Sequence, residues 1–172
     1  DFIVGYIQGA VDVNPDVQVA VSYVGNFDDS AKGKDLSLAM YNSGADVGFN
    51  VAGNAGNGLI EAAGETGKFA IGVDSDQSYL APETVITSAM KRVDNAVYAT
   101  VEALVNGTYA GGLSSFDIHN GGVDIAPTQD LLTEEVITAV EDVKAKLEAG
   151  EITVPATAEE FDAAYGDVYT LD

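Results

Sequence analysis

The chain contains no cysteine and only one histidine among its 172 residues. Without cysteine it can form no disulfide, no thiolate metal site and no thiol nucleophile. The lone histidine, His119, excludes metal sites built on a histidine pair and makes a histidine-dependent catalytic triad unattractive. The sequence therefore predicts neither a metal centre nor a bound cofactor.

Basic residues are also scarce. The chain has 7 Lys and Arg against 28 Asp and Glu, which gives a net charge of −21. Because nucleic acids and anionic membrane surfaces are bound mainly through Lys and Arg, both are poor partners for this chain. We expect the acidity to keep the protein soluble in a salty or extracytoplasmic setting.

Long apolar runs are missing as well. No segment approaches the roughly 20 apolar residues that cross a bilayer. No signal peptide begins the sequence, so we expect it to start inside a mature protein. Hydrophobic residues make up 47% of the chain, which is enough for a core, and the length fits one domain or a small domain with an appendage.

The stretch 46–77 combines two strands, a helix and two polar loops. An apolar run ends at the glycine-rich segment 53–58, a short helix follows, and a second apolar run ends at the acidic loop 74–77. Parallel strands joined by a helix place both strand-end loops at one edge of the sheet, where ligands bind in open α/β sheets. We therefore expect the functional site at these two loops.

The remaining pattern predicts an α/β fold in which a parallel sheet is flanked by helices. The chain opens on a helix with no strand before it, which is unusual for such a fold and indicates a part upstream. The composition changes near Ser88, so we expect a hinge or domain boundary there. The region 109–126 is expected to be a twisted hairpin or irregular crossover, and the tail after 150 is expected to pack loosely or to wrap a neighbouring surface. The predicted helices cover 1–11, 31–43, 59–66, 88–105 and 131–149, and the predicted strands cover 17–24, 47–51, 69–73 and 85–87.

The glycine loop matches neither common phosphate-binding motif. Gly58 is followed by Leu59 where a Walker loop needs lysine, and the spacing Gly53-x-x-Gly56-x-Gly58 differs from the dinucleotide fingerprint. A helix N-terminus there could still bind a hydroxyl or carbonyl oxygen, although tight turns explain the glycines equally well. The amides of Asn54 and Asn57 favour a ligand because they supply a donor and an acceptor together.

Asp74 and Asp76 form a candidate carboxylate pair. Two acids at this spacing are more often a turn and helix-cap device than partners in acid–base catalysis, and no well-placed His or Cys accompanies them. A single Asp at the end of a strand is well suited to accept hydrogen bonds from vicinal sugar hydroxyls. We therefore favour a ligand-binding role for Asp74 over a catalytic one.

Lys91 is expected in the first turn of a helix, where the helix dipole disfavours a cation. A solvated lysine is the usual explanation, but the position just past the expected hinge favours a side chain that points into a cleft. Three aromatic residues are candidate platforms for stacking a ring, namely Phe27, Phe49 and Tyr79. Core packing is the commoner explanation for Phe49.

A set of short motifs gives the chain a family resemblance over residues 2–112. The chain resembles the C-terminal half of the basic membrane protein family of substrate-binding lipoproteins, which includes bacterial purine nucleoside receptors. The combination Gly-Val-Asp-x-Asp-Gln followed by Thr-Ser-x-x-Lys is quite specific. The motifs are Phe2-x-x-Gly5-Tyr6-x-x-Gly9, Asn14-Pro15, Phe27-x-Asp29, Gly44-Ala45-Asp46-Val47, Ala52-Gly53-x-x-Gly56-x-Gly58, Gly72-Val73-Asp74-x-Asp76-Gln77 and Thr87-Ser88-x-x-Lys91.

The resemblance implies a type I periplasmic-binding-protein fold, in which two α/β lobes joined by a three-strand hinge close on a nucleoside. It implies that Asp74 holds ribose hydroxyls, that Lys91 reaches the ligand across the cleft, and that Gly53 and Asn54 are further contacts. Residues 1–87 would be the second lobe without its first strand. Residues 88–172 would be the hinge crossover and the C-terminal segment of the first lobe.

The expected function is that of an extracytoplasmic solute-binding component of an ABC-type importer, which binds a nucleoside, with a purine base favoured, and is not an enzyme. Its expected partners are the importer permease and the missing N-terminal half of the fold, at the cell surface or in the periplasm and with a lipid anchor in the full-length protein. The alternative is a nucleoside- or sugar-processing enzyme that uses Asp74 and Asp76. A ligand-sensing regulator would need a DNA-binding headpiece, and the net charge of −21 argues against one in this chain.

Overall fold

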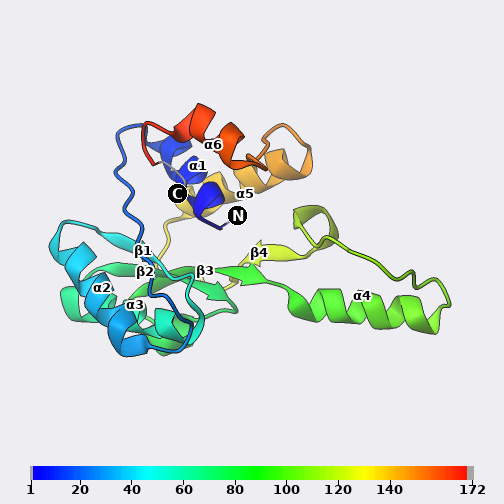
Figure 1. Ribbon diagram of the computed structural model, residues 1–172, viewed down its shortest axis with the longest axis horizontal. Helices are drawn as coiled ribbons and strands as arrows, with labels where there is room; N and C mark the ends of the chain where they lie inside the picture. The colour runs from blue at the N-terminus through cyan, green and yellow to red at the C-terminus, as the bar shows by residue number, and fades with distance from the viewer. Residues whose placement is uncertain (1, 170–172) are drawn as a thin grey trace.

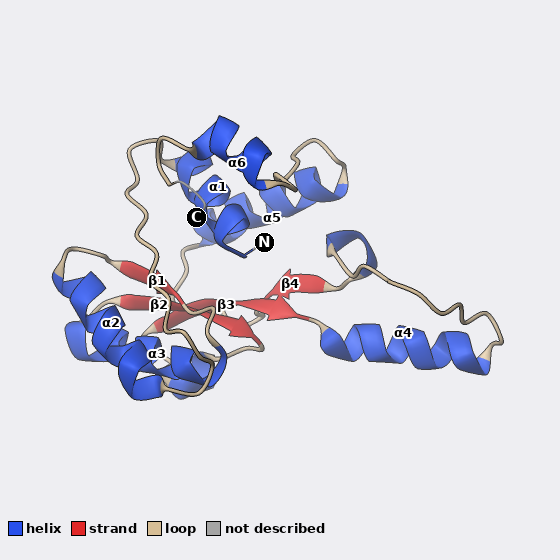
Figure 2. Ribbon diagram, in the orientation of Figure 1, coloured by secondary structure: helices blue, strands red, loops and turns tan. Residues whose placement is uncertain are grey.

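A four-stranded sheet forms the centre of the computed structural model, which describes residues 2–169. The strands are β1 (Val47–Phe49), β2 (Phe69–Asp74), β3 (Val85–Lys91) and β4 (Val123–Ile125), and they lie in the order β1-β2-β3-β4. The first three are parallel and β4 runs antiparallel to β3 (Figures 1 and 2). The predicted α/β fold with a mostly parallel sheet is confirmed.

Helices cover the sheet on both sides. The helices α2 (Ser30–Asn42) and α3 (Asn57–Thr66) lie against one face, while α1 (Phe2–Val13), α5 (Glu134–Glu148) and α6 (Ala158–Tyr165) gather on the opposite side (Figure 1). The side chain of Asp29 accepts a hydrogen bond from Lys32 N and thereby caps the start of α2. Three short 3-10 turns complete the fold, η1 (Gly53–Gly56), η2 (Ser78–Leu80) and η3 (Ile118–Asn120).

The core under the sheet joins α2 and α3 to the strands. Its buried residues are Tyr41, Ile60, Ala62, Ala63, Ala70 and Val85. The hydroxyl of Tyr41 donates to the carbonyl of Phe69 at 2.8 Å, so this polar atom is satisfied inside the core. Burial raises the pKa of Tyr41 to about 12. This core fixes the β1-α3-β2 unit and thereby places the loops that follow its strands.

Of the two expectations for the tail after Gly150, loose packing is wrong, whereas contact with a neighbouring surface agrees with the structure. The tail forms α6, whose Phe161 is fully buried against Val4 and Ile7 of α1. The side chain of Thr157 caps the helix by accepting a hydrogen bond from Glu160 N. A Thr-x-x-Glu pattern is a recognised helix start, so the sequence did contain the signal for this element.

The predicted strand over 17–24 is wrong. This segment has no ladder hydrogen bonds, although its odd-numbered valines are half-buried in the alternating way that the pattern predicts. An isolated extended segment gains nothing from strand propensity, because a strand is stabilised by pairing with a neighbour. Within residues 2–169 no strand pairs with 17–24, and β1 pairs only with β2.

The predicted helix beginning at Ser88 is also wrong in its start. The strand β3 continues to Lys91, and α4 (Val93–Val105) begins only after Arg92. The reason is pairing on both sides, since Ser88 and Ala89 lie opposite Gly72 and Val73 of β2, and Ala89 opposite Ile125 of β4. The region 109–126 is an irregular crossover that ends in β4.

The helix α4 extends away from the sheet and from the other helices (Figure 1). None of its residues is buried. Among the described residues, no helix is both long enough and apolar enough to cross a membrane.

Candidate functional site

Asp74 and Lys91 meet at the carboxyl edge of the sheet. The ammonium nitrogen of Lys91 lies 3.0 Å from Oδ1 of Asp74, and the two side chains are 52% and 53% exposed. The two residues end neighbouring parallel strands, because Asp74 lies opposite Met90 in the register. Ion pairs this exposed contribute about 0–1 kcal/mol to stability. Because about half of each side chain is exposed, both charged groups are accessible to a ligand.

The backbone of Asp74 is strained. Its φ of +67° is the one positive value among the non-glycine residues that the structure describes. Ser75 N donates to the carbonyl of Val73 at 2.8 Å, so Asp74 is the central residue of a three-residue γ-turn of the positive-φ kind, which is rare and strained. Strained residues of this type cluster at ligand sites, where the surrounding structure holds them.

Asp76 is engaged differently from Asp74. It accepts hydrogen bonds from Ser78 N at 3.0 Å and Ser78 Oγ at 2.6 Å, and it is also hydrogen-bonded by Thr128. Burial acts to raise the pKa of Asp76, but the bonds from Ser78 and Thr128 together outweigh it and hold that pKa below its usual value. Asp76 thus stabilises the turn that leads into η2, whereas the Asp74 carboxylate forms an ion pair with Lys91.

The glycine loop packs against the loop before α2. Ala55 N donates to the carbonyl of Phe27 at 2.9 Å, and Gly53, with a φ of +56°, lies directly beside the Phe27 side chain. Phe27, on the loop before α2, is 72% exposed, and Asn54, on the glycine loop, is exposed as well. Gly56 and Gly58 are required by packing, against Asn50 and the start of α2 respectively. The exposed residues of this loop that could reach a ligand are therefore Gly53 and Asn54.

A buried polar network, which the sequence did not reveal, links the three parallel strands. Asn50 and Ser88 are 1% and 0% exposed, and Gln77 contacts both of them. A polar residue directly after the apolar strand β1 was the available signal for Asn50. Ser88 was instead placed at the start of the predicted helix 88–105.

The three candidate aromatic rings separate into two groups. Phe49 packs against Phe2 and Tyr6, with ring centroids 6.3 and 5.3 Å apart. This contact agrees with the core-packing interpretation. Phe27 and Tyr79 are 72% and 73% exposed and remain candidates for stacking. The ammonium group of Lys91 lies 5.7 Å from the centre of the Phe2 ring, which adds a cation–π contact on the side of α1.

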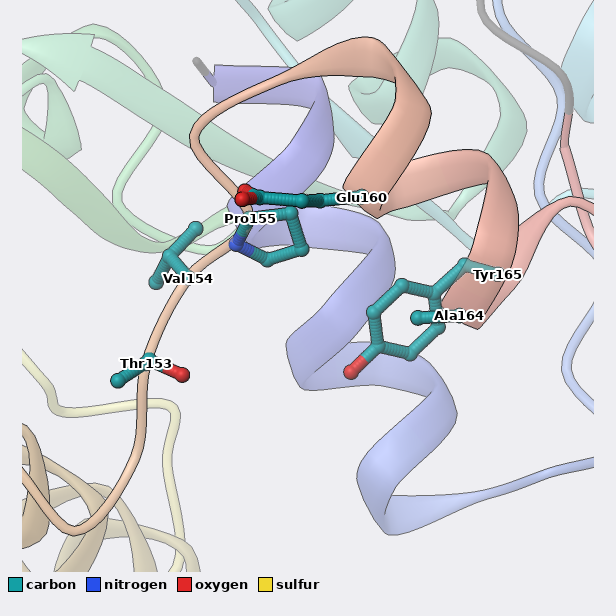
Figure 3. Close-up of a pocket in the computed structure, with 6 residues that line it drawn as sticks. All are labelled: Thr153, Val154, Pro155, Glu160, Ala164 and Tyr165. Carbon is teal, nitrogen blue, oxygen red and sulfur yellow. The ribbon is translucent and has the colours of Figure 1, made fainter.

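A separate groove lies beside α6 and does not include these residues (Figure 3). It is lined by Thr153, Val154, Pro155, Glu160, Ala164 and Tyr165 and has a volume of about 460 Å³. Two hydrogen bonds hold its lining, since Gln8 Nε2 of α1 donates to Thr153 O and Ala156 N donates to the Glu160 carboxylate. No strand-end loop contributes a residue to the lining of this groove.

Comparison with known proteins shows that the chain is similar to substrate-binding proteins of ABC transporters. The family described as ABC transporter substrate-binding protein PnrA-like matches residues 1–158. The chain is 36% identical over 170 residues to the ABC transporter nucleoside-binding protein BmpA of Lactococcus lactis, a match that covers 88% of this chain and 48% of the relative. It is 34% identical over 165 residues to Basic membrane protein A of Borreliella burgdorferi, covering 94% of this chain and 49% of that protein.

Solved structures share the fold. A solute-binding protein of an ABC transporter system from Aeropyrum pernix superposes with a TM-score of 0.81 at 27% identity, over 96% of this chain and 56% of that one. A transcriptional activator of the comK gene from Bacillus halodurans superposes with a TM-score of 0.82 at 24% identity, over 89% and 53%. The chain spans about half the length of the curated relatives it matches.

Proposed function

The chain belongs to the PnrA-like family of ABC transporter substrate-binding proteins, and we propose that it contributes one side of a nucleoside-binding cleft, with a purine base favoured. The observation that carries the proposal is the meeting of Asp74 and Lys91 at the carboxyl edge of the sheet. The name of the Lactococcus lactis relative, at 36% identity, supports the choice of a nucleoside. No bond is made or broken in this function, and the nucleoside is passed to an importer permease.

Each candidate residue has a role that its chemistry supports. The Asp74 carboxylate accepts hydrogen bonds from the two vicinal hydroxyls of the ribose, and the Lys91 ammonium donates to an acceptor on the nucleoside. Because their ion pair is half-exposed, a ligand can replace part of it at small cost. Gly53 offers backbone groups and Asn54 an amide, and Phe27, exposed beside Gly53, supplies a face for stacking a base.

We propose that the chain is divided in the way that the two-lobed fold of the family implies. Residues 1–87 form the second lobe without its first strand, and residues 88–172 form the crossover and the C-terminal part of the first lobe. The one-sided pairing of β1 and the unpaired extended segment 17–24 support a further strand in the second lobe. That strand belongs to the N-terminal half, which we propose as the main partner of this chain.

The apolar stripe of α4 supports the same partner. Its side chains recur at helical spacing and are 52–80% exposed, namely Val93, Val97, Val101, Leu104 and Val105. Burying one such side chain is worth about 1.5–3 kcal/mol, so this face gains substantially from a complementary surface on the first lobe. The protein is proposed to act outside the cytoplasm with a lipid anchor, consistent with relatives named basic membrane proteins.

Calorimetric titration of the protein that carries both halves of the fold tests this function. Guanosine, inosine and adenosine are titrated in parallel with free ribose, free purine bases and branched amino acids. We expect saturable binding of at least one purine nucleoside and none of the amino acids. Binding of ribose or of an amino acid, without binding of any of the three nucleosides, would overturn the nucleoside proposal.

A further inference from the structure

The side chain of Gln77 connects the ends of β1 and β2. Its Oε1 accepts a hydrogen bond from Val73 N at 2.9 Å and a second from Asn50 Nδ2 at 3.1 Å. Its backbone N–H donates to Ser88 Oγ of β3 at 3.0 Å. One residue therefore bonds to Asn50 directly after β1, to Val73 near the end of β2 and to Ser88 in the middle of β3, and all three partners are buried.

These hydrogen bonds lie beside the γ-turn that sets the orientation of the Asp74 side chain. The carbonyl of Val73 is held by Ser75 N at 2.8 Å, and the N–H of Val73 is held by Gln77. Both backbone groups of Val73 are thus fixed at the residue where the strained turn begins. A positive φ at a non-glycine residue persists only where its surroundings determine it, and Gln77 supplies that constraint from the far side of the loop.

Two glycines provide the space that this network occupies. A side chain at Gly72 would collide with Ser88 Oγ and with the Gln77 side chain, and a side chain at Gly56 would overlap the Asn50 amide. Asn50 also follows β1 immediately, and the glycine loop with Gly53 and Asn54 begins three residues later. The network therefore sets the position of the glycine loop relative to the acidic loop.

We propose that Gln77 is a positioning residue, which holds the Asp74 carboxylate in the orientation that binds the sugar hydroxyls. The inference rests on the proposed nucleoside function and names a residue that does not itself contact the ligand. Gln77 acts through Val73 and Asn50, so its removal should impair hydroxyl recognition more than overall folding.

The test is a double-mutant cycle on the protein that carries both halves of the fold. Dissociation constants for inosine and for its 2′,3′-dideoxy analogue are measured for wild type, Gln77→Met, Asp74→Asn and the double variant. Gln77→Met keeps the volume but removes the acceptor, and we expect about tenfold weaker binding of inosine. The dideoxy analogue should lose much less, and Gln77→Met should have no further effect in the Asp74→Asn background.

Gln8→Met is the matched control, because Gln8 is a buried glutamine whose side chain donates a hydrogen bond to Thr153 O, away from the glycine loop and the acidic loop. It should change inosine binding no more than about twofold. Ser88→Ala removes the partner of Gln77 N and gives a second, milder variant should Gln77→Met not fold. If Gln77→Met weakens inosine and the dideoxy analogue equally, or adds its full effect to Asp74→Asn, Gln77 is a structural residue only.

Amide hydrogen exchange separates a failure of this inference from a failure of the proposed function. Peptides that cover 71–78 should exchange faster in Gln77→Met than in Gln8→Met, whether or not any nucleoside binds. Faster exchange without nucleoside binding by the wild type would reject the nucleoside and retain the constraint on Asp74. Unchanged exchange would reject the positioning role even if nucleosides bind.

Discussion

Lys91 Nζ lies 3.0 Å from Asp74 Oδ1, across the ends of two adjacent parallel strands and with about half of each side chain open to solvent. In the sequence these residues are separated by a loop, a 3-10 turn and a strand. Their pairing gives the carboxyl edge of the sheet one group that accepts hydrogen bonds and one that donates them.

Lys91→Ala should weaken nucleoside binding by about 1–3 kcal/mol, because it leaves a polar group of the bound ligand without its partner. The free energy of unfolding should change by less than about 1 kcal/mol, since the ion pair is exposed. Calorimetric titration and urea unfolding measure the two quantities. Lys146→Ala, which removes a similarly exposed ion pair with Asp142 on α5, is the matched control. An unchanged dissociation constant for Lys91→Ala would remove Lys91 from the site.

Asp74→Gly and Asp74→Ala should reverse the usual order of stability. Alanine normally stabilises a protein relative to glycine, but at a φ of +67° its Cβ is strained. We expect Asp74→Gly to be more stable than Asp74→Ala by about 1 kcal/mol in urea unfolding. Both variants should lose nucleoside binding. Equal stability of the two variants would show that the turn relaxes when the aspartate is removed.

The carboxylate of Asp76 should make folding sensitive to acid. Its pKa is lower in the folded than in the unfolded chain, so its stabilising effect is complete above the unfolded pKa and is lost as the pH falls through the folded pKa. The difference in unfolding free energy between wild type and Asp76→Asn should therefore shrink as the pH falls below about 4. Urea unfolding at a series of pH values measures it. A difference that is independent of pH over this range contradicts the assignment of Asp76 as an ionised turn residue.

Val101→Asn on the apolar stripe of α4 should distinguish a solvent-facing helix from an interface. In this chain alone Val101 is 52% exposed, so the unfolding free energy should change by less than about 0.5 kcal/mol. In the protein that carries both halves, the same change should destabilise by about 1–3 kcal/mol. Glu102→Gln, on the neighbouring position of the same helix, is the control. Equal small effects in both proteins would show that the stripe stays exposed.

The sequence predicted the β1-α3-β2 unit because its signals are local. The apolar runs of β1 and β2, the helix between them and the acidic loop are all recorded in consecutive residues. The importance of Asp74 followed from its place at the end of a strand and from the family motif. Its contact with Lys91 was not predicted, because the family resemblance placed Lys91 across the cleft, whereas the structure places both residues at the same edge of the sheet. The role of Asp74 in binding stays a prediction.

Features that depend on partners distant in the sequence could not be predicted in the same way. The segment 17–24 has strand propensity but no neighbour, and residues 88–91 are in a strand because β2 and β4 pair with them on both sides. The Gln77 network depends on the close approach of three parallel strands, which no local sequence pattern predicts. Asp74 likewise gave no sign of its positive φ, because aspartate occurs in many turn types.

The space beside Gly72 also determines how this region tolerates substitution. Ser88 and Gln77 fill the volume that a side chain at Gly72 would need, whereas nothing lies within 4 Å of a Cβ placed at Gly5 or Gly9 in α1. In a saturation mutagenesis library, Gly5 and Gly9 should accept alanine freely. Gly72 should accept it only when Gln77 or Ser88 becomes smaller at the same time. A substitution at Gly72 is therefore tolerated only together with a substitution at Gln77 or Ser88, although these residues are separated along the chain.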